Sequence, residues 1–321
     1  MSKFIGAEYG DENAQVNASA EVRVFRFSPP ARIAMLRSMA PLPNELVLQH
    51  VRAALAEDVG NGDVTTLATV PEHATAKAAM VAREELVLCG VPLAAAAFRE
   101  TAAATRVHAL VSDGERLQAG AKMLEVEGPA RALLTAERVA LNFVQRLSGV
   151  ASLAAEFVAA VAGTRATILD TRKTTPGWRE LEKYAVRCGG AQNHRLGLWD
   201  MVLIKDNHLA ALRDAKPNAI AAAVQRAREK YPALKIEVEA DTLEQVQQAA
   251  SAGADIVLLD NMTLEQLREA VRIANGRAKT EASGGVNLRT VRAIAETGVD
   301  YVSVGAMTHS ARAMDIGLDF F

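Results

Sequence analysis

ATILDTRKTTPG, residues 166–177, is the stretch that decides how this chain folds. The apolar run at its start predicts a buried strand, because it ends abruptly in the polar and charged residues that follow Asp170. Pro176-Gly177 then interrupts regular structure. A second apolar run, residues 201–204, also ends in charge, at Lys205. Two strands that stop at charged residues suggest a site built at their ends.

Basic side chains gather in and between these two strands' ends. Arg172 and Lys173 follow the first strand, Lys205 follows the second, and Arg187 and Arg195 lie between them. The net charge of the whole chain is −2, so this basic cluster is local. A local cluster of this kind predicts a pocket for a small, strongly anionic ligand and not a nucleic-acid surface.

Length and composition bound the possible architectures. With 321 residues, of which 50% are apolar, the chain can form one large domain or two ordinary ones. Cys89 and Cys188 lie far apart, which gives neither a disulfide framework nor a metal-binding spacing. No apolar run reaches the ~18 to 20 residues of a membrane span, and no signal peptide is recognisable. We therefore expect a cytoplasmic protein that binds neither membranes nor nucleic acids.

The chain divides into four predicted parts. Residues 1–40 lack periodicity and predict a poorly ordered extension, with Met35 or Met39 as a possible true start. Residues 41–150 predict an α/β sandwich domain, opened by a helix that Asn44 would cap. We expect a βα-barrel domain in residues 151–306, and residues 307–321 to pack back on the N-terminal domain.

Several segments support the first of these domains. Alternating patterns predict strands at residues 77–88, 106–111 and 122–126, with an alanine-rich helix near residues 92–104. Residues 130–161 have helical periodicity, with an expected interruption at Ser148-Gly149.

Beyond Thr164 strands and helices alternate. The candidate strands are residues 166–170, 201–206, 235–240, 255–260, 279–283 and 301–305, and the candidate helices are 219–230, 243–252, 264–274 and 288–297. This rhythm calls for parallel strands joined by helices, and six strands suggest a closed or nearly closed βα barrel. The fold class we predict is therefore α/β.

Each predicted strand carries an unusual polar group at its carboxyl end. Taken singly, such residues are more often helix caps or solvated charges. In a βα barrel, however, all these strand ends share one rim, so the residues would meet in one site. Ser283-Gly284-Gly285, which leads into a predicted helix, and Val304-Gly305-Ala306 could bind a phosphate through backbone N–H groups. Glu239 and Asp260 suit sugar hydroxyls or a water-mediated Mg²⁺.

Several sequence blocks closely resemble the quinolinate phosphoribosyltransferase family, also called nicotinate-nucleotide pyrophosphorylase (carboxylating). The likeness covers residues 44–321, and the blocks stand in one order. The most specific are Asp170 to Gly177, Asn193 to Leu198, Leu203 to His208, Glu237-Val238-Glu239, Leu259-Asp260-Asn261 and Glu281 to Gly285.

The resemblance implies a type II phosphoribosyltransferase fold with an incomplete barrel, and a transferase of pyridine nucleotide (NAD) biosynthesis. Its members use Mg²⁺ to transfer phosphoribose from phosphoribosyl pyrophosphate to quinolinate. They release pyrophosphate and CO₂ and form nicotinate mononucleotide. Members are at least dimers, in which Arg138 would complete the partner's site.

The resemblance also implies roles for individual residues. Arg138, Arg172, His194 and Arg195, with Thr171 beside them, would hold the quinolinate carboxylates, and Lys173 and Lys205 would face the pyrophosphate. Glu239 and Asp260 would bind the ribose hydroxyls, with Mg²⁺ held near them mainly through the substrate pyrophosphate. Ser283, Gly284 and Gly285, with Val304, Gly305 and Ala306, would bind the 5′-phosphate. Lys173, Lys205, Glu239 and Asp260 are the catalytic candidates. Strand alternation places Glu237 and Glu239 on the same face, so either could be the ribose-binding carboxylate.

Three alternatives remain open. A related phosphoribosyltransferase linked to molybdate transport shares the architecture. A Schiff-base aldolase on a phosphate-binding barrel could use Lys205. A non-catalytic nucleotide- or RNA-binding protein is a third class, which the scarcity of aromatic residues disfavours.

Overall fold

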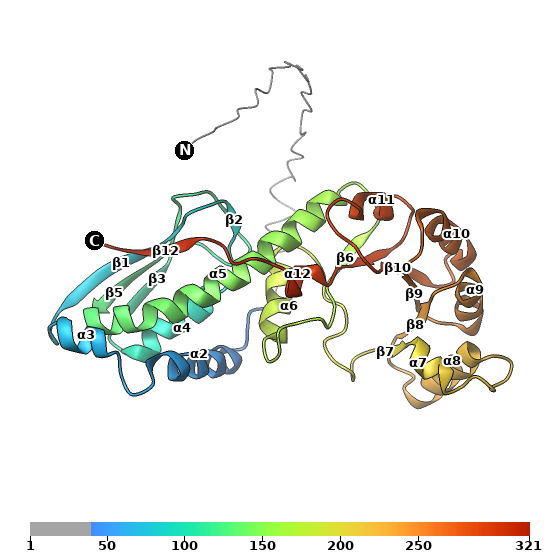
Figure 1. Ribbon diagram of the computed structural model, residues 1–321, viewed down its shortest axis with the longest axis horizontal. Helices are drawn as coiled ribbons and strands as arrows, with labels where there is room; N and C mark the ends of the chain where they lie inside the picture. The colour runs from blue at the N-terminus through green and yellow to red at the C-terminus, as the bar shows by residue number, and fades with distance from the viewer. Residues whose placement is uncertain (1–39) are drawn as a thin grey trace, which may run out of the picture. The chain divides into compact units, whose positions relative to one another are not determined.

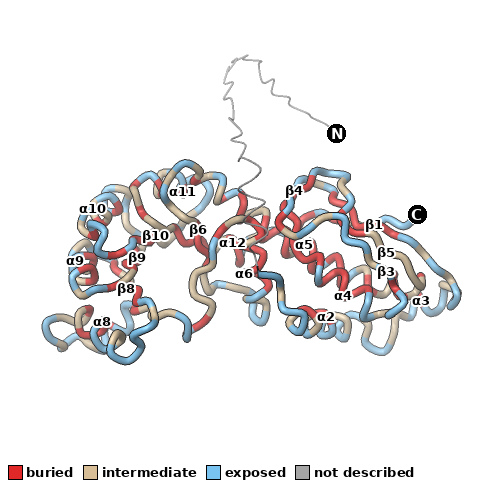
Figure 2. The backbone as a smooth tube through the Cα atoms, turned by 180° about the vertical axis from the view of Figure 1, so that it is seen from behind, coloured by how far each residue is buried: buried red, intermediate tan, exposed pale blue. Residues whose placement is uncertain are grey.

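A long helix, α5 (Ala130–Ala160), organises the part of the chain that the computed structural model describes, residues 40–321 (Figure 1). Apolar residues recur along α5 at helical spacing, and the helix is buried over most of its length (Figure 2). The expected interruption at Ser148-Gly149 is wrong, because the helix continues through both residues. The expected N-terminal extension and the possible start at Met35 or Met39 lie outside the described residues.

Gly149 has a packing role instead. A Cβ atom at this position would lie 1.8 Å from the carbonyl oxygen of Arg312, so only a glycine lets the C-terminal segment approach α5 this closely. The adjacent Ser148 hydroxyl bonds with both backbone groups of Cys89. Ser148 and Gly149 therefore do not interrupt α5. They bring it into contact with the segment around Cys89 and with the C-terminal segment at Arg312.

One side of α5 packs against an antiparallel sheet with the strand order β12-β1-β5-β3. Its strands are β1 (Thr75–Ala82), β3 (Arg106–Ala109), β5 (Lys122–Pro129) and β12 (Ile316–Phe320), and a separate two-stranded ribbon joins β2 (Leu86–Val87) to β4 (Arg116–Leu117). Helix α4 (Val91–Thr101) packs against α5 and β3, and α2 (Asn44–Val59) packs against α4. The short helix α3 (Val64–Thr69) also contacts α5.

Two details of this half concern the predicted limits. Helix α2 begins at Asn44 after Pro43, with no side-chain cap, so the expected Asn44 cap is wrong. Strand β12 pairs antiparallel with β1, which brings the last residues of the chain into the sheet of the N-terminal half. The domain limits 41–150, 151–306 and 307–321 stay predictions, since residues 40–321 form one unit.

The second half contains six parallel strands in the order β6-β11-β10-β9-β8-β7. They are β6 (Thr167–Leu169), β7 (Val202–Ile204), β8 (Ile236–Ala240), β9 (Ile256–Asp260), β10 (Lys279–Ser283) and β11 (Tyr301–Ser303). Strands β6 and β7 are the two edges, so the barrel does not close between them; Gln192 pairs with Leu169 on the β6 edge. The predicted fold class, an incomplete βα barrel beside an α+β sandwich, is confirmed.

Helices join these strands. They are α6 (Arg179–Cys188), α7 (Asp206–Ala210), α8 (Ala219–Lys230), α9 (Leu243–Ala252), α10 (Leu264–Ala274), α11 (Val291–Ala295) and α12 (Ala306–His309). Side-chain caps fix the starts of α8, α9 and α10, where Asn218, Thr242 and Thr263 accept backbone N–H bonds. None of the helices in residues 40–321 has both the length and the apolar composition needed to cross a membrane.

Candidate active site

The carboxyl ends of the parallel strands surround one cavity of about 600 Å³. Its charged and polar lining comes from the segments that follow β6 and β7, from the carboxyl-terminal parts of β8, β9 and β10, and from the residues that follow β9 and β10. Further groups come from residues 194 and 195 and from β11. The lining residues are Thr171, Arg172, Lys173, His194, Arg195, Leu203, Lys205, Glu239, Leu258, Asp260, Asn261, Glu281, Ser283, Gly284, Gly285 and Ser303. Parallel strands thus bring together residues more than a hundred positions apart.

Two arginines line the cavity without a carboxylate partner among residues 40–321. Arg195 donates from a terminal guanidinium nitrogen to the carbonyl of Met201, at 3.3 Å. Burial, and then the neighbouring positive charge of Arg172, lower the pKa of Arg195. The Nε of Arg172 is buried and has no hydrogen-bond partner within residues 40–321. An unpaired buried donor beside a second guanidinium calls for an anionic ligand.

Two lysines approach the same cavity from different strands. The hydroxyl of Thr308 donates to the carbonyl oxygen of Lys173, at 2.7 Å, which fixes the loop after β6. A Cβ atom on Gly305 would lie 3.1 Å from Cδ of Lys173, so the lysine side chain passes directly over this glycine. On the other side, Nζ of Lys205 contacts a carboxylate oxygen of Glu239 at 2.6 Å.

The ends of β9 and β10 form a loop contact that shapes the rim. The amide of Asn261 donates to the carboxylate of Asp260, at 2.7 Å, and its backbone N–H donates to the carbonyl of Ser283, at 3.0 Å. Gly284 has φ of 96°, and a Cβ atom there would lie 2.1 Å from the Asn261 side chain. Gly284 is therefore required both by its backbone angle and by this close approach.

A buried network of hydrogen bonds around Asp170 holds the backbone of His194 in place. Nζ of Lys183 donates to Asp170 at 2.5 Å, and the same carboxylate accepts the backbone N–H of His194 at 2.8 Å and the amide of Asn193 at 2.7 Å. Burial raises the pKa of Asp170 against the opposing effect of Lys183, and burial lowers the pKa of Lys183. Arg187 donates to Asn193 at 2.5 Å, which extends the network outward.

Two buried glutamates lie beside the His194 ring, and one of them, Glu281, lines the cavity. His194 Nε2 is 2.9 Å from Glu237 and 3.5 Å from Glu281, and its Nδ1 accepts the backbone N–H of Arg195. Burial, and then the negative charge of Glu237, raise the pKa of Glu281 to about 8. One oxygen of each glutamate is buried without a partner among the described residues. A single proton between the two carboxyl groups would give each of these oxygens a partner.

Most of the predicted site residues meet in this cavity. Those that line it are Thr171, Arg172, Lys173, His194, Arg195, Lys205, Glu239, Asp260, Ser283, Gly284 and Gly285. Arg138, Val304, Gly305 and Ala306 do not line it. Arg138 is exposed on α5, and Gly305 lies beneath Lys173.

Other predictions need correction or extension. Helix α11, Val291–Ala295, is shorter than the predicted helix 288–297, because residues 288–290 form a turn. Glu281, Asn261 and Ser303 line the cavity but were not predicted as site residues. Strand alternation could have found Glu281, because it lies two residues before Ser283 and so on the same face.

Comparisons with known proteins agree over nearly all of the described chain. The family model for the N-terminal domain of quinolinate phosphoribosyl transferase matches residues 63–148, and that for its C-terminal domain matches residues 150–319. The nicotinate-nucleotide pyrophosphorylase [carboxylating] of Mycobacterium leprae is 47% identical over 275 residues, which cover 84% of this chain and 95% of that protein.

Further relatives give the same result. The probable nicotinate-nucleotide pyrophosphorylase [carboxylating] of Bacillus subtilis is 41% identical over 82% of this chain and 89% of its own length. The solved structure of the nicotinate-nucleotide pyrophosphorylase from Francisella tularensis aligns with a TM-score of 0.83 and 40% identity. That alignment covers 88% of this chain and 99% of the solved one.

Proposed function

The chain belongs to the quinolinate phosphoribosyltransferase family, and from this premise we propose what its cavity does. The protein transfers phosphoribose from phosphoribosyl pyrophosphate to the ring nitrogen of quinolinate. Loss of CO₂ from the ring then gives nicotinate mononucleotide, a precursor in NAD biosynthesis. The enzyme is thus a nicotinate-nucleotide diphosphorylase (carboxylating), a pentosyl transferase.

The paired arginines are the observation that carries this function. Arg172 and Arg195 line one cavity, neither is ion-paired within residues 40–321, and the buried Nε of Arg172 has no partner. An aromatic diacid would supply carboxylate oxygens to both guanidinium groups. Charge-assisted hydrogen bonds of this kind contribute about 1.5–3 kcal/mol each, enough to fix the ring in one orientation.

The other groups of the cavity suit the phosphorylated sugar. We assign Lys173 and Lys205 to the pyrophosphate, and Glu239 and Asp260 to the ribose hydroxyls. Glu239 is preferred over Glu237, since Glu239 lines the cavity whereas Glu237 is buried against His194. The backbone of Ser283 to Gly285 is assigned to the 5′-phosphate, with residues 304–306 supporting it from beneath Lys173.

The chemistry follows from these positions. Departure of pyrophosphate leaves a developing cation on C1 of the ribose, and the lysine charges stabilise the leaving group. The arginines hold the ring nitrogen toward C1, so the new bond forms between oriented partners. The positive charge of the alkylated pyridinium stabilises the electron pair that CO₂ leaves on the adjacent ring carbon. A proton from solvent then takes the place of CO₂, and decarboxylation needs no general base.

The cavity also suits Mg²⁺, the cofactor that we propose. Glu239 and Asp260 place hard oxygen donors on one rim, but Glu239 is paired with Lys205. Two rim carboxylates, one of them occupied, match a cation that keeps several waters and is held mainly by substrate phosphates. When bound, Mg²⁺ would neutralise charge on the pyrophosphate.

We further propose a homodimer in which Arg138 completes the partner's site. Arg138 is exposed and lies outside the cavity of its own chain. Large apolar side chains are exposed on α3 and in the loop before β7, with Val64 78%, Leu198 72% and Trp199 69% accessible. Burial of such side chains against a second copy would remove them from water. A cytoplasmic location fits the two free cysteines.

The function is tested by acceptor profiling of the purified full chain with phosphoribosyl pyrophosphate and Mg²⁺. We expect nicotinate mononucleotide from quinolinate, and little or none from nicotinate, which lacks the carboxylate adjacent to the ring nitrogen. A chain that uses another acceptor and leaves quinolinate unchanged would instead fit the transferase linked to molybdate transport.

Nothing in the cavity favours the aldolase. Schiff-base lysines are commonly desolvated in an apolar pocket, whereas the Lys205 side chain is 47% exposed and contacts a carboxylate at 2.6 Å. Borohydride should therefore trap no adduct on Lys205 in the presence of carbonyl substrates. A trapped adduct at this residue would support the aldolase.

A further inference from the structure

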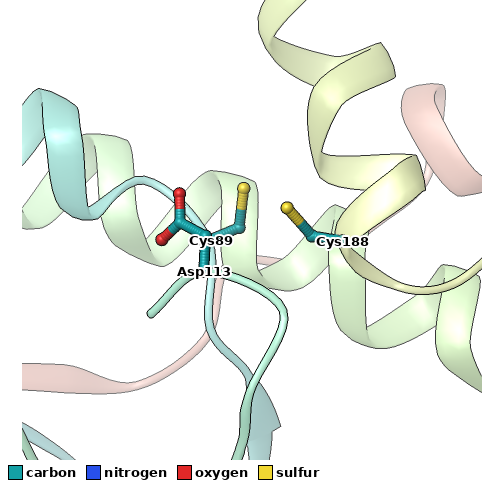
Figure 3. Close-up of side chains that lie close together, drawn as sticks. All are labelled: Cys89, Asp113 and Cys188. Carbon is teal, nitrogen blue, oxygen red and sulfur yellow. The ribbon is translucent and has the colours of Figure 1, made fainter. Parts of the chain in front are cut away.

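The two cysteines of the chain face each other in the interior (Figure 3). Neither of them lines the cavity just described. Cys89 follows β2, and Cys188 is the last residue of α6. Both are buried, and their sulfur atoms lie within 4.8 Å of each other. The sequence contains no other cysteine, so within one chain each thiol can form a disulfide only with the other.

Glycines next to both cysteines hold this arrangement against α5. A Cβ atom on Gly90 would lie 3.3 Å from Cα of Val144, and a Cβ atom on Gly189 would lie 2.3 Å from the carbonyl oxygen of Ala151. Both cysteine-bearing segments thus pack on the same helix through bare backbone. Packing against α5 fixes the backbone that carries each cysteine, and the two sulfur atoms lie between these two segments.

A carboxylate beside the thiols already has its hydrogen bonds. Asp113 accepts the backbone N–H groups of Gly90 and Val91, each at 3.0 Å, and the hydroxyl of Tyr184 at 3.0 Å. Tyr184 lies one turn before Cys188 on α6. Asp113 therefore connects the loop after β2 to α6, and this role accounts for its position without a metal ion.

The environment favours a neutral product over a charged one. Burial raises the pKa of the Cys89 thiol, so keeping this group as a thiolate is costly. A soft metal ion would need both cysteines as thiolates. A disulfide carries no charge and suits the same buried space.

We propose that Cys89 and Cys188 form a dithiol site that a hydroperoxide converts to an intramolecular disulfide. The sulfur of Cys188 attacks one peroxide oxygen as its thiol proton is lost, the O–O bond breaks, and a sulfenic acid and one alcohol or water molecule form. The sulfur of Cys89 then displaces water from the sulfenic acid, and the S–S bond forms. Two thiols are oxidised, one O–O bond is reduced, and both thiol protons leave in the products.

The bond would have two physical consequences. It would close a loop of roughly a hundred residues and so raise the unfolding temperature. It would also anchor the end of α6 beside Arg187, whose guanidinium donates to Asn193 in the network beneath His194. The disulfide would join α6 to the segment that leads from β2 into α4.

Titration of the full-length, reduced protein with hydrogen peroxide tests the proposal. We expect the loss of both thiols together, an intact mass lower by two hydrogen atoms, and a peptide pair joining residues 89 and 188 on a non-reducing map. A reductant should restore both thiols, and the oxidised form should unfold at a higher temperature than the reduced form.

The matched controls are Cys89→Ser, in which dimedone should trap Cys188 as a sulfenic acid, and Cys188→Ser, in which Cys89 should form no dimedone adduct. If either variant fails to fold, the wild-type peptide map still decides the question. Disulfides between chains, independent over-oxidation of each cysteine, or thiols that survive until methionines oxidise would overturn the proposal. So would release of a bound metal ion in proportion to the thiols titrated.

Discussion

Arg172 is the residue on which the proposed diacid site depends most. Its Nε is buried without a partner within residues 40–321, while Arg195 stands beside it without a carboxylate. In the absence of an anion this arrangement is unfavourable, because a buried donor loses its hydrogen bonds to water. The ligand therefore supplies the hydrogen-bond acceptor that the protein does not provide for Arg172. The protein without ligand should stay folded when this guanidinium is removed.

Replacement of Arg172 by alanine should abolish turnover without unfolding the protein. Each lost charge-assisted hydrogen bond of about 1.5–3 kcal/mol reduces kcat/KM by roughly 10- to 150-fold. Pyrophosphate release gives the rate, and circular dichroism reports the fold. Arg165→Ala is the matched control, since Arg165 is paired with Asp300 away from the cavity. Near-normal turnover of quinolinate by Arg172→Ala would refute the assignment.

Glu281 should make the stability of the protein depend on pH. Its pKa is raised from 4.5 to about 8, chiefly by burial and then by Glu237, with His194 and Ser303 acting in the opposite direction. The folded state thus keeps a proton that the unfolded chain has released. The resulting stabilisation is complete below pH 4.5 and is lost as the pH rises through about 8.

Thermal unfolding between pH 6 and pH 9 measures this effect. The unfolding temperature of the wild-type protein should fall across the range. The free energy of unfolding should decrease by an amount on the order of a few kcal/mol. Glu281→Gln, which cannot ionise, should show a flatter profile, whereas Glu265→Gln on the exposed face of α10 should behave as wild type. Parallel profiles for Glu281→Gln and wild type would show that this carboxyl group is ionised throughout.

At the scale of elements, the loop after β10 offers a matched pair of glycines. Gly284 and Gly285 both have positive φ, of 96° and 59°. A Cβ atom on Gly284 would lie 2.1 Å from the Asn261 side chain, whereas one on Gly285 would meet nothing within 4 Å. The two positions separate steric contact from backbone strain.

Gly284→Ala should therefore be the more damaging substitution. It must displace Asn261 and with it the Asp260 carboxylate, so we expect KM for phosphoribosyl pyrophosphate to rise by about tenfold or more, equivalent to ~1.4 kcal/mol. Gly285→Ala adds only strain of about 1–2 kcal/mol in the backbone. Initial-rate kinetics on both variants checks the order. Equal KM values for the two would place the phosphate elsewhere.

The elements themselves were predictable where local chemistry sets their limits. The limits of α8, α9 and α10 agree with the sequence prediction, because caps such as Thr242 and breakers such as Gly253 mark their ends. Helix α5 was predicted to break at Ser148-Gly149, since the sequence does not reveal that Gly149 faces the backbone of Arg312. Long-range packing decided the outcome there.

At the scale of the whole molecule, the proposed dimer predicts complementation between inactive subunits. Arg138→Ala would damage the partner's site, and Arg172→Ala would damage its own. A mixed dimer of the two variants should therefore contain one site in which both arginines are intact. Its activity should reach up to about half of that of a wild-type dimer. Mixing the variants after subunit exchange and measuring turnover checks this.

The control is each variant incubated alone, which should stay inactive. Recovery limited to the sum of the two separate activities would show that Arg138 serves the site of its own chain, or none. Sedimentation of the wild-type chain gives the oligomeric state independently, because a monomer that is fully active would also exclude the shared site.

How much of the cavity could be predicted also depends on scale. Lys205, Glu239 and Asp260 were predicted because each lies near the carboxyl end of a predicted strand, and the carboxyl ends of parallel strands share one rim. Glu281 and Ser303 were missed because each lies at the centre of its predicted strand, 279–283 or 301–305, away from the carboxyl end where we expected the site residues. Arg138 could be assigned only by resemblance, since no pattern within one chain shows what a second chain receives.

The central claim is that one cavity binds an aromatic diacid together with a phosphorylated sugar and couples bond formation to loss of CO₂. The most direct measurement follows CO₂ and pyrophosphate together from quinolinate labelled in the carboxylate next to the ring nitrogen. We predict equal amounts of the two products, with release of each requiring both phosphoribosyl pyrophosphate and Mg²⁺. Pyrophosphate without CO₂, or CO₂ without the phosphorylated sugar, would contradict the account.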